Sequence, residues 1–139
     1  MSHLHATKAA GRAFYQNQQQ GPMVMLNLLR YRAAADYTAT PELQPAGSTL
    51  SGREAYACYV QHIRPLLAQA QAEVLYFGTA TAFLIGPEAE QWDAILLVRY
   101  PNKANFLAFA NDPAYAPLAG HRTAAPADSR LLPTWPATL

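Results

Sequence analysis

The sequence predicts a single α+β domain, residues 1–139, in which four strands and two long helices alternate along the chain. Short apolar runs at 23–31 and 92–100, bounded by turn-forming residues, are typical of strands. A helix-start motif at Ser51 opens an amphipathic segment, and Asn102 begins a second helix. Of the 139 residues, 51% are hydrophobic, so one domain can bury a core without a disulfide or a metal.

Residues 1–20 are predicted as an N-terminal helical extension. The segment from Ala6 to Gln20 permits a helix, although Gly11 and the glutamines at 18–20 fit a linker equally well. Gly21 and Pro22 end it, and a strand follows at 23–31. Strand alternation puts two apolar sets on opposite faces, one with Val24, Leu26 and Leu28 and the other with Met23, Met25, Asn27 and Leu29.

Residues 33–50 form a predicted inserted loop. The segment carries Pro41, Pro45 and Gly47 and shows no periodicity. Loops of this length within a compact domain are often functional. We expect this one to cover the mouth of a pocket or to embrace a partner subunit.

The first long helix is predicted to run from Ser51 to about Gln71. Ser51 and Glu54 form a capping box, in which each side chain accepts from the other residue's backbone amide. We expect a bend at Pro65, because proline removes a backbone hydrogen bond. The predicted buried stripe comprises Tyr56, Tyr59, Val60, Ile63, Leu67 and Ala70.

The second half of the chain is predicted as strand, strand, helix and strand. The strands are 73–85, with Gly78 as a bulge, then 92–100, and finally an edge strand at 129–135. Asn102 caps the second helix, and Asp112 caps a short helical turn that Pro117 and Gly120 should end.

This order matches the ferredoxin-like βαββαβ arrangement, a four-stranded antiparallel sheet with both long helices on one face. The strands are nevertheless apolar on both faces, and a monomer would leave one face bare. The pattern therefore predicts a homodimer, with Met23 or Met25 in an interface that buries more than ~1,200 Å².

Composition excludes several classes of function. Ten basic and nine acidic residues give a net charge of +1, which argues against nucleic acid or an anionic membrane as partner. No apolar run approaches the ~18 residues of a membrane span. The lone Cys58 and a polar N-terminal segment without a hydrophobic signal core suit the cytoplasm.

Several blocks closely resemble the domain-of-unknown-function 1330 family of the dimeric α+β barrel superfamily. They read MVMLNLLRYR, SGREAYACYV, LIGPEAEQWDAILLVRYP, FANDPAY and GHRTAAPADSRLLPT. The segment ADYTATPELQPAG resembles an insertion found in a longer subset of that family. The resemblance, from about Gly21 to Thr134, implies a dimeric barrel but no particular activity. Superfamily relatives include monooxygenases, isomerases, haem-modifying enzymes and sensors.

The candidate catalytic residues are His121, Arg122 and Asp128. His121 can act as an acid or base near neutral pH, and Asp128 can orient the imidazole and raise its pKa. Arg122 can hold a carboxylate or enolate oxygen. A structural alternative is an Arg122–Asp128 ion pair that ties the loop to the last strand, with Ser129 as a local cap.

Asn27, Trp92 and Ser129 are the candidate ligand-binding residues. Asn27 is the one polar residue inside a seven-residue apolar run of the first strand, and an unpartnered buried amide costs about 1–3 kcal/mol. It serves either as a cross-sheet hydrogen-bonding group or as a pocket ligand. Trp92 is either partial core or a pocket wall that offers its indole N–H. No His, Cys or carboxylate spacing indicates a metal site.

Two functions remain open from the sequence. One is a cofactor-free small-molecule enzyme that transfers a proton, with His121 as base and Arg122 as anion clamp. The other is a non-catalytic dimeric module that binds or senses a small ligand. A catalyst requires His121 within hydrogen-bond reach of a cavity, together with a group that orients the ring.

Overall fold

The computed structural model describes residues 2–46 and 49–139. Its helices are α1 (Lys8–Gln16), α2 (Gly52–Gln69), α3 (Lys103–Ala110) and α4 (Ala119–Ala124), with short 3₁₀ turns at Pro41–Leu43 and Ala116–Leu118. Its strands are β1 (Met23–Tyr31), β2 (Glu73–Thr79), β3 (Ala94–Tyr100) and β4 (Pro126–Thr134).

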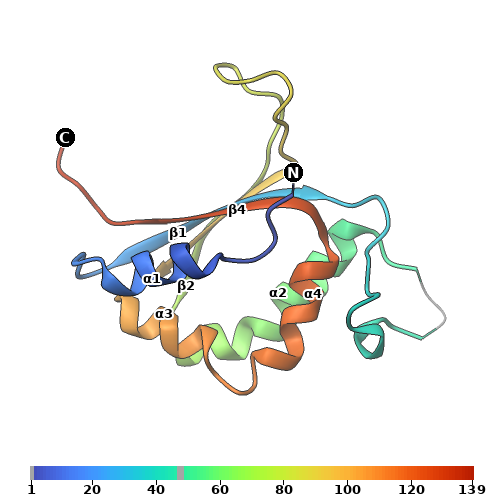
Figure 1. The fold of residues 1–139 in the computed structure, drawn as a ribbon, viewed down its shortest axis with the longest axis horizontal. Coiled ribbons are helices and arrows are strands. Elements are labelled where there is room, and N and C mark those ends of the chain that lie inside the picture. The colour runs from blue at the N-terminus through green and yellow to red at the C-terminus, as the bar shows by residue number, and fades with distance from the viewer. Residues whose placement is uncertain (1, 47–48) are drawn as a thin grey trace.

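The four strands form one sheet in the order β2-β3-β1-β4, and all neighbouring strands are antiparallel. Helices α2, α3 and α4 lie on one side of this sheet (Figure 1). Strand order and helix placement are those of the ferredoxin-like fold, so the predicted fold class is confirmed.

Burial alternates along the two central strands. In β1 the odd-numbered residues from Met23 to Leu29 are buried, and Leu96 and Val98 of β3 are buried on the same side. These side chains meet the apolar stripe of α2 and form the core. The residues between them are half-buried and form what we call the open sheet face: Val24, Leu26, Leu28, Ile95 and Leu97.

Met23 and Met25 therefore lie in the core of the chain, at 0% and 3% exposure. The prediction that either of them reaches a dimer interface is wrong. Strand alternation defined the two sets of β1 residues, but it could not tell which set the helices cover.

The strand predicted at 73–85 ends at Thr79, where the ladder with β3 reaches Ala94. Residues 80–93 instead form a long projecting connection, which we call the arm (Figure 1). The bulge was predicted at Gly78, but in the structure the register of β2 against β3 shifts between Val74 and Tyr76. The atoms nearest to a Cβ at Gly78 belong to the ring end of Tyr76, an exposed side chain that can move aside.

Helix α2 has the predicted capping box: Ser51 Oγ accepts from the Glu54 amide, and Glu54 Oε1 accepts from the Ser51 amide. Its predicted stripe is buried except for Val60, which is half-buried. Pro65 lies inside the helix.

The predicted stop at Pro117 and Gly120 is wrong. Pro117 lies in the 3₁₀ turn at Ala116–Leu118, and α4 follows at once with Gly120 inside it. A side chain at position 120 would overlap Thr40 and Leu43, so this glycine serves close packing rather than termination. His121 and Arg122 consequently project from a helix, and β4 begins at Pro126, earlier than expected.

The N-terminal extension is helical over α1. Thr7 caps its first turn, and the Lys103 ammonium donates to the carbonyls of Phe14 and Asn17 at its end, both at 2.9 Å. Phe14 meets Phe106 of α3 edge-on. These contacts hold α1 against α3.

Candidate functional site

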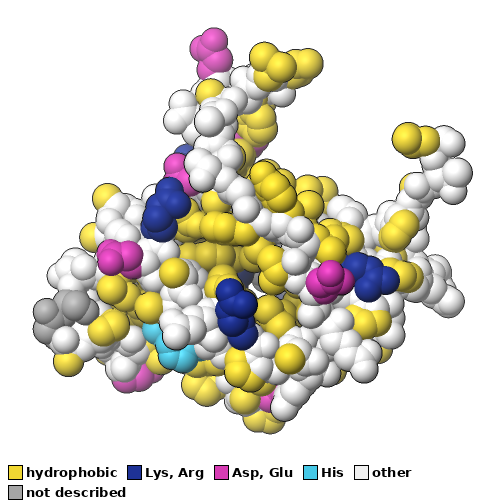
Figure 2. Space-filling model, turned by 180° about the vertical axis from the view of Figure 1, so that it is seen from behind, with side chains coloured by type: hydrophobic (Ala, Val, Ile, Leu, Met, Phe, Trp, Pro, Cys, Tyr) yellow, Lys and Arg dark blue, Asp and Glu magenta, His cyan; other side chains and the backbone are white. Residues whose placement is uncertain are grey.

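A cavity of about 90 Å³ lies between the helix-covered face of the sheet and the helices. Val74 on β2 and Leu131 on β4 belong to its lining and are each 45% exposed, so the cavity meets solvent at both sheet edges. Figure 2 shows hydrophobic side chains gathered around a hollow on one side of the molecule. The polar members of the lining are Asn27, Arg122, Tyr56, Tyr59, Tyr100 and Tyr115.

Asn27 brings an amide to the sheet wall of this cavity. The residue is 6% exposed, and its Nδ2 donates to the Leu96 carbonyl at 3.2 Å. Among the described residues this is the one hydrogen bond of the side chain, which leaves Oδ1 available to a molecule in the cavity.

Arg122 brings a positive charge from α4. Its one hydrogen bond within the described chain is long, 3.5 Å from Nη1 to the Leu4 carbonyl. The ion pairs among the described residues have His3 or Arg130 as the basic partner. No carboxylate of these residues lies within 4.0 Å of the Arg122 guanidinium. The guanidinium thus keeps most of its donors for a ligand.

Four tyrosines line the cavity beside these two residues. The Tyr59 and Tyr115 hydroxyls are 3.0 Å apart and hydrogen-bonded. Burial raises the pKa of Tyr56 and of Tyr100, and burial with the neighbouring Tyr115 raises that of Tyr59. These phenols stay protonated at neutral pH, so they serve as hydrogen-bond donors and not as bases.

His121 does not line the cavity. The ring is 5% exposed, its Nδ1 hydrogen-bonds to the Tyr37 hydroxyl at 2.7 Å, and it stacks on His62. Burial, and next the neighbouring His62, lower its pKa. The expected carboxylate that would orient the ring and raise its pKa is replaced by a phenol.

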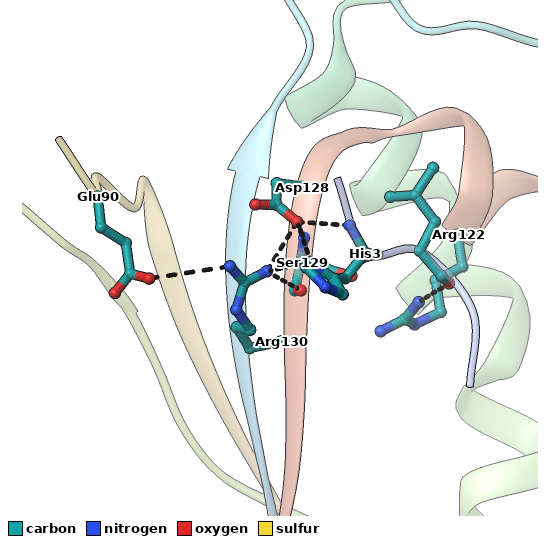
Figure 3. Close-up of polar contacts among 7 residues, drawn as sticks. His3, Glu90, Arg122, Asp128, Ser129 and Arg130 are labelled. Carbon is teal, nitrogen blue, oxygen red and sulfur yellow. Dashed lines mark hydrogen bonds and ion pairs between the residues drawn. The ribbon is translucent and has the colours of Figure 1, made fainter. Parts of the chain in front are cut away.

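Asp128 pairs with Arg130 rather than with Arg122. Its Oδ1 accepts from Arg130 Nη1 at 2.8 Å and from the His3 amide at 2.7 Å. Figure 3 shows Arg122 on the other side of His3, away from this cluster. Burial raises the Asp128 pKa, but these hydrogen bonds outweigh burial and hold it below its usual value.

Ser129 and Trp92 also lie outside the cavity lining. Ser129 Oγ donates to the His3 carbonyl at 2.6 Å, so it fastens the N-terminal segment to β4. Trp92 is buried, at 5% exposure. The Arg130 guanidinium lies over its indole, 4.8 Å from the centroid of the indole ring. Of the six predicted site residues, Asn27 and Arg122 line the cavity and the other four do not.

The inserted loop 33–50, described apart from residues 47–48, packs on α4. Tyr37 is buried against His121, and the Asp36 amide donates to the Ala124 carbonyl. None of its described residues lines the cavity, so the expectation that it covers the pocket mouth is wrong.

Sequence reasoning missed two of the four cavity tyrosines, Tyr100 and Tyr115. Helical periodicity predicts Tyr56 and Tyr59 in the buried stripe of α2. Tyr100 ends β3 and Tyr115 precedes a 3₁₀ turn, so no local pattern connects them to the other two. The described residues contain no group of three side chains able to hold a metal, and none of their helices is long and apolar enough to cross a membrane.

Comparison with known proteins gives a family but no activity. The family model described as "Domain of unknown function (DUF1330)" matches residues 46–133. The crystal structure of a protein of unknown function from Rhodopseudomonas palustris is 34% identical over 100% of both chains, with a TM-score of 0.86. Its methylated form is 36% identical over 99% of this chain and 96% of that one, with a TM-score of 0.85.

More distant structures have the same general description. A dimeric ferredoxin-like protein of unknown function from Bacteroides fragilis is 12% identical, with a TM-score of 0.47 over 81% of this chain and 93% of that one. A search of curated proteins found no match.

Proposed function

The chain belongs to the DUF1330 family of unknown function, and we propose that this member binds a small, mostly apolar molecule with one anionic group. The observation that carries the proposal is the convergence of Arg122, Asn27 and protonated tyrosines on an otherwise apolar cavity. Binding sites for small molecules typically combine an apolar lining with a few placed polar groups.

The charge in the cavity selects for an anion. Among the described residues that line the cavity, Arg122 is the one that carries a charge, and the protonated tyrosines Tyr56 and Tyr100 can donate hydrogen bonds. A carboxylate would accept from both, and Asn27 Oδ1 would accept from a donor elsewhere on the ligand.

The size of the cavity selects for a compact ligand. Its volume is about 90 Å³, which is less than the roughly 150 Å³ of an apolar cavity that holds benzene. A molecule with one ring therefore fits when part of it extends to the open rim at Val74 or Leu131, and larger ring systems do not suit these dimensions.

Binding without catalysis fits the site better than proton transfer. His121 lies outside the lining and hydrogen-bonds to Tyr37, and burial raises the pKa of Tyr56 and of Tyr100. The described residues of the lining include no histidine, cysteine or carboxylate, the side chains that commonly exchange a proton near neutral pH.

We also propose that the chain works as a homodimer in the cytoplasm. The open sheet face exposes parts of Leu26, Leu28 and Leu97, which a second copy would cover. The lone Cys58 is free, which suits a reducing compartment.

Benzoate and its neutral isostere benzamide test the proposed pocket. We expect benzoate to shift the NMR signals of the Asn27 side-chain amide, and Arg122→Gln to weaken benzoate binding by roughly 10–100-fold. Benzamide affinity should change little in that variant, because benzamide carries no charge.

The matched control is Arg64→Gln, which removes an exposed arginine of α2 outside the cavity. This variant should bind benzoate like the parent protein. Equal affinities for benzoate and benzamide, or shifts confined to residues outside the cavity, would contradict the anion-binding proposal.

A further inference from the structure

The arm, residues 80–93, carries an apolar tip that the chain itself leaves uncovered. Leu84 and Ile85 are 97% and 93% exposed, and Phe83 beside them is 41% exposed. Figure 2 shows hydrophobic side chains at the far end of this projection. Adjacent, fully exposed large apolar residues in one segment are a mark of a contact surface.

The base of the arm is fastened to the sheet. The Asp93 amide donates to the Leu29 carbonyl at 2.7 Å, and the Ala80 amide donates to the Asp93 carbonyl at 2.8 Å. Glu90 lies 3.8 Å from Arg130, which belongs to β4 at the opposite edge from β2. The arm is thus held across the end of the sheet.

The arm and the open sheet face lie on the same side of the molecule. In Figure 1 the helices lie below the sheet, and the arm rises above it. Arg130 shows the same placement, because it is opposite Leu28 of the open sheet face in the β1–β4 register. The apolar tip and the open sheet face therefore border the same space above the sheet, which one partner can fill.

The arm would enlarge an interface built on the open sheet face. Four strands about 4.8 Å apart and seven residues long, at about 3.3 Å each, have a flat footprint of roughly 450 Å². A standard interface buries about 800 Å² of accessible surface on each partner. The exposed tip residues would add apolar area to that of the sheet face.

We propose that the arm clamps a second copy of this chain, with the tip around Leu84 and Ile85 packed on the subunit that covers the open sheet face. This inference rests on the proposed homodimer, and twofold symmetry makes the clamp reciprocal. A membrane fits the arm less well than a second copy does. A flat membrane surface would not fill the space between the arm and the open sheet face, and anionic lipid would repel the exposed Glu88 beside the tip.

The first test replaces both tip residues, Leu84→Ser with Ile85→Ser, and measures the dimer dissociation constant by sedimentation velocity. We expect at least a tenfold weaker dimer, with the circular dichroism spectrum and the benzoate affinity unchanged. The control is Leu139→Ser, which changes an equally exposed leucine at the C-terminal end and should leave the dissociation constant as it is.

The second test is limited digestion with chymotrypsin, which cleaves after phenylalanine and leucine. Cleavage at Phe83 and Leu84 should be at least tenfold slower in the dimer than in the diluted monomer. A parent dimer that is cut at the tip at an undiminished rate, or that tolerates both substitutions, overturns the clamp and leaves the homodimer standing.

A parent protein that stays monomeric at about 100 μM overturns both the clamp and the homodimer. Binding of that monomer to phosphatidylglycerol vesicles through the tip would point to a membrane instead. Neither result touches the proposed ligand pocket, which is tested by the NMR shifts at Asn27.

Discussion

At the scale of single residues, the His121 imidazole is buried without an acidic partner. Tyr37 holds one ring nitrogen, and His62 stacks on the ring at a centroid distance of 5.2 Å. A positive charge on His121 would face His62 from α2 and the phenol of Tyr37 from the inserted loop, and it would lose hydration. The folded protein therefore favours the neutral ring.

We expect the free energy of unfolding to fall as the pH drops from 7.5 to 5.5. The pKa of His121 in the folded state lies below its unfolded value, so the unfolded chain binds the proton first and gains population. His121→Gln should flatten this part of the profile. Urea denaturation at several pH values measures it, and a variant slope equal to that of the parent would contradict the assignment.

At the scale of elements, the first residue of helix α2, Gly52, is packed against the backbone of two other segments. The Gly52 amide donates to the Arg32 carbonyl at 2.9 Å, and a Cβ at this position would lie 2.6 Å from the Arg32 nitrogen. The neighbouring Ala125 carbonyl would also collide with it. Both obstacles are backbone atoms, which cannot move aside as a flexible side chain can.

We expect Gly52→Ala to destabilise the protein by roughly 1–3 kcal/mol, because the helix start must shift away from β1. Thermal or urea unfolding measures the change. The matched control is Gly11→Ala in α1, where a Cβ meets nothing within 4 Å. There alanine should be neutral or stabilising, by up to about 1 kcal/mol, since it favours the helix. Equal effects at the two positions would refute the packing argument.

At the scale of the whole molecule, we expect the open sheet face to form the interface of the proposed homodimer. Leu26, Leu28 and Leu97 are half-buried within one chain, and a second sheet would complete their burial. We expect light scattering to give twice the 15.2 kDa mass of the chain. Leu26→Asp should yield a folded monomer, because it places a charge in the centre of the interface. A parent protein that still has a mass of 15.2 kDa at about 100 μM would refute the dimer.

The sequence by itself determined the order of the four strands and of helices α2 and α3, the α2 capping box and the apolar stripe that faces the sheet. Each of these depends on residues close together in the chain, such as Ser51 with Glu54, or on a period that sterics impose. The same local logic marked Asn27 as an unusual polar residue in a strand.

Only the tertiary structure decided which residues share the site. His121 and Arg122 are adjacent in sequence, but neighbours on a helix point about 100° apart. Arg122 consequently faces the cavity while His121 meets Tyr37 from the inserted loop. Tyr100 and Tyr115 reach the same cavity from other elements, and Asp128 finds Arg130 two residues away. Such meetings depend on how the helices pack against the sheet, which is a long-range property that no local spacing encodes.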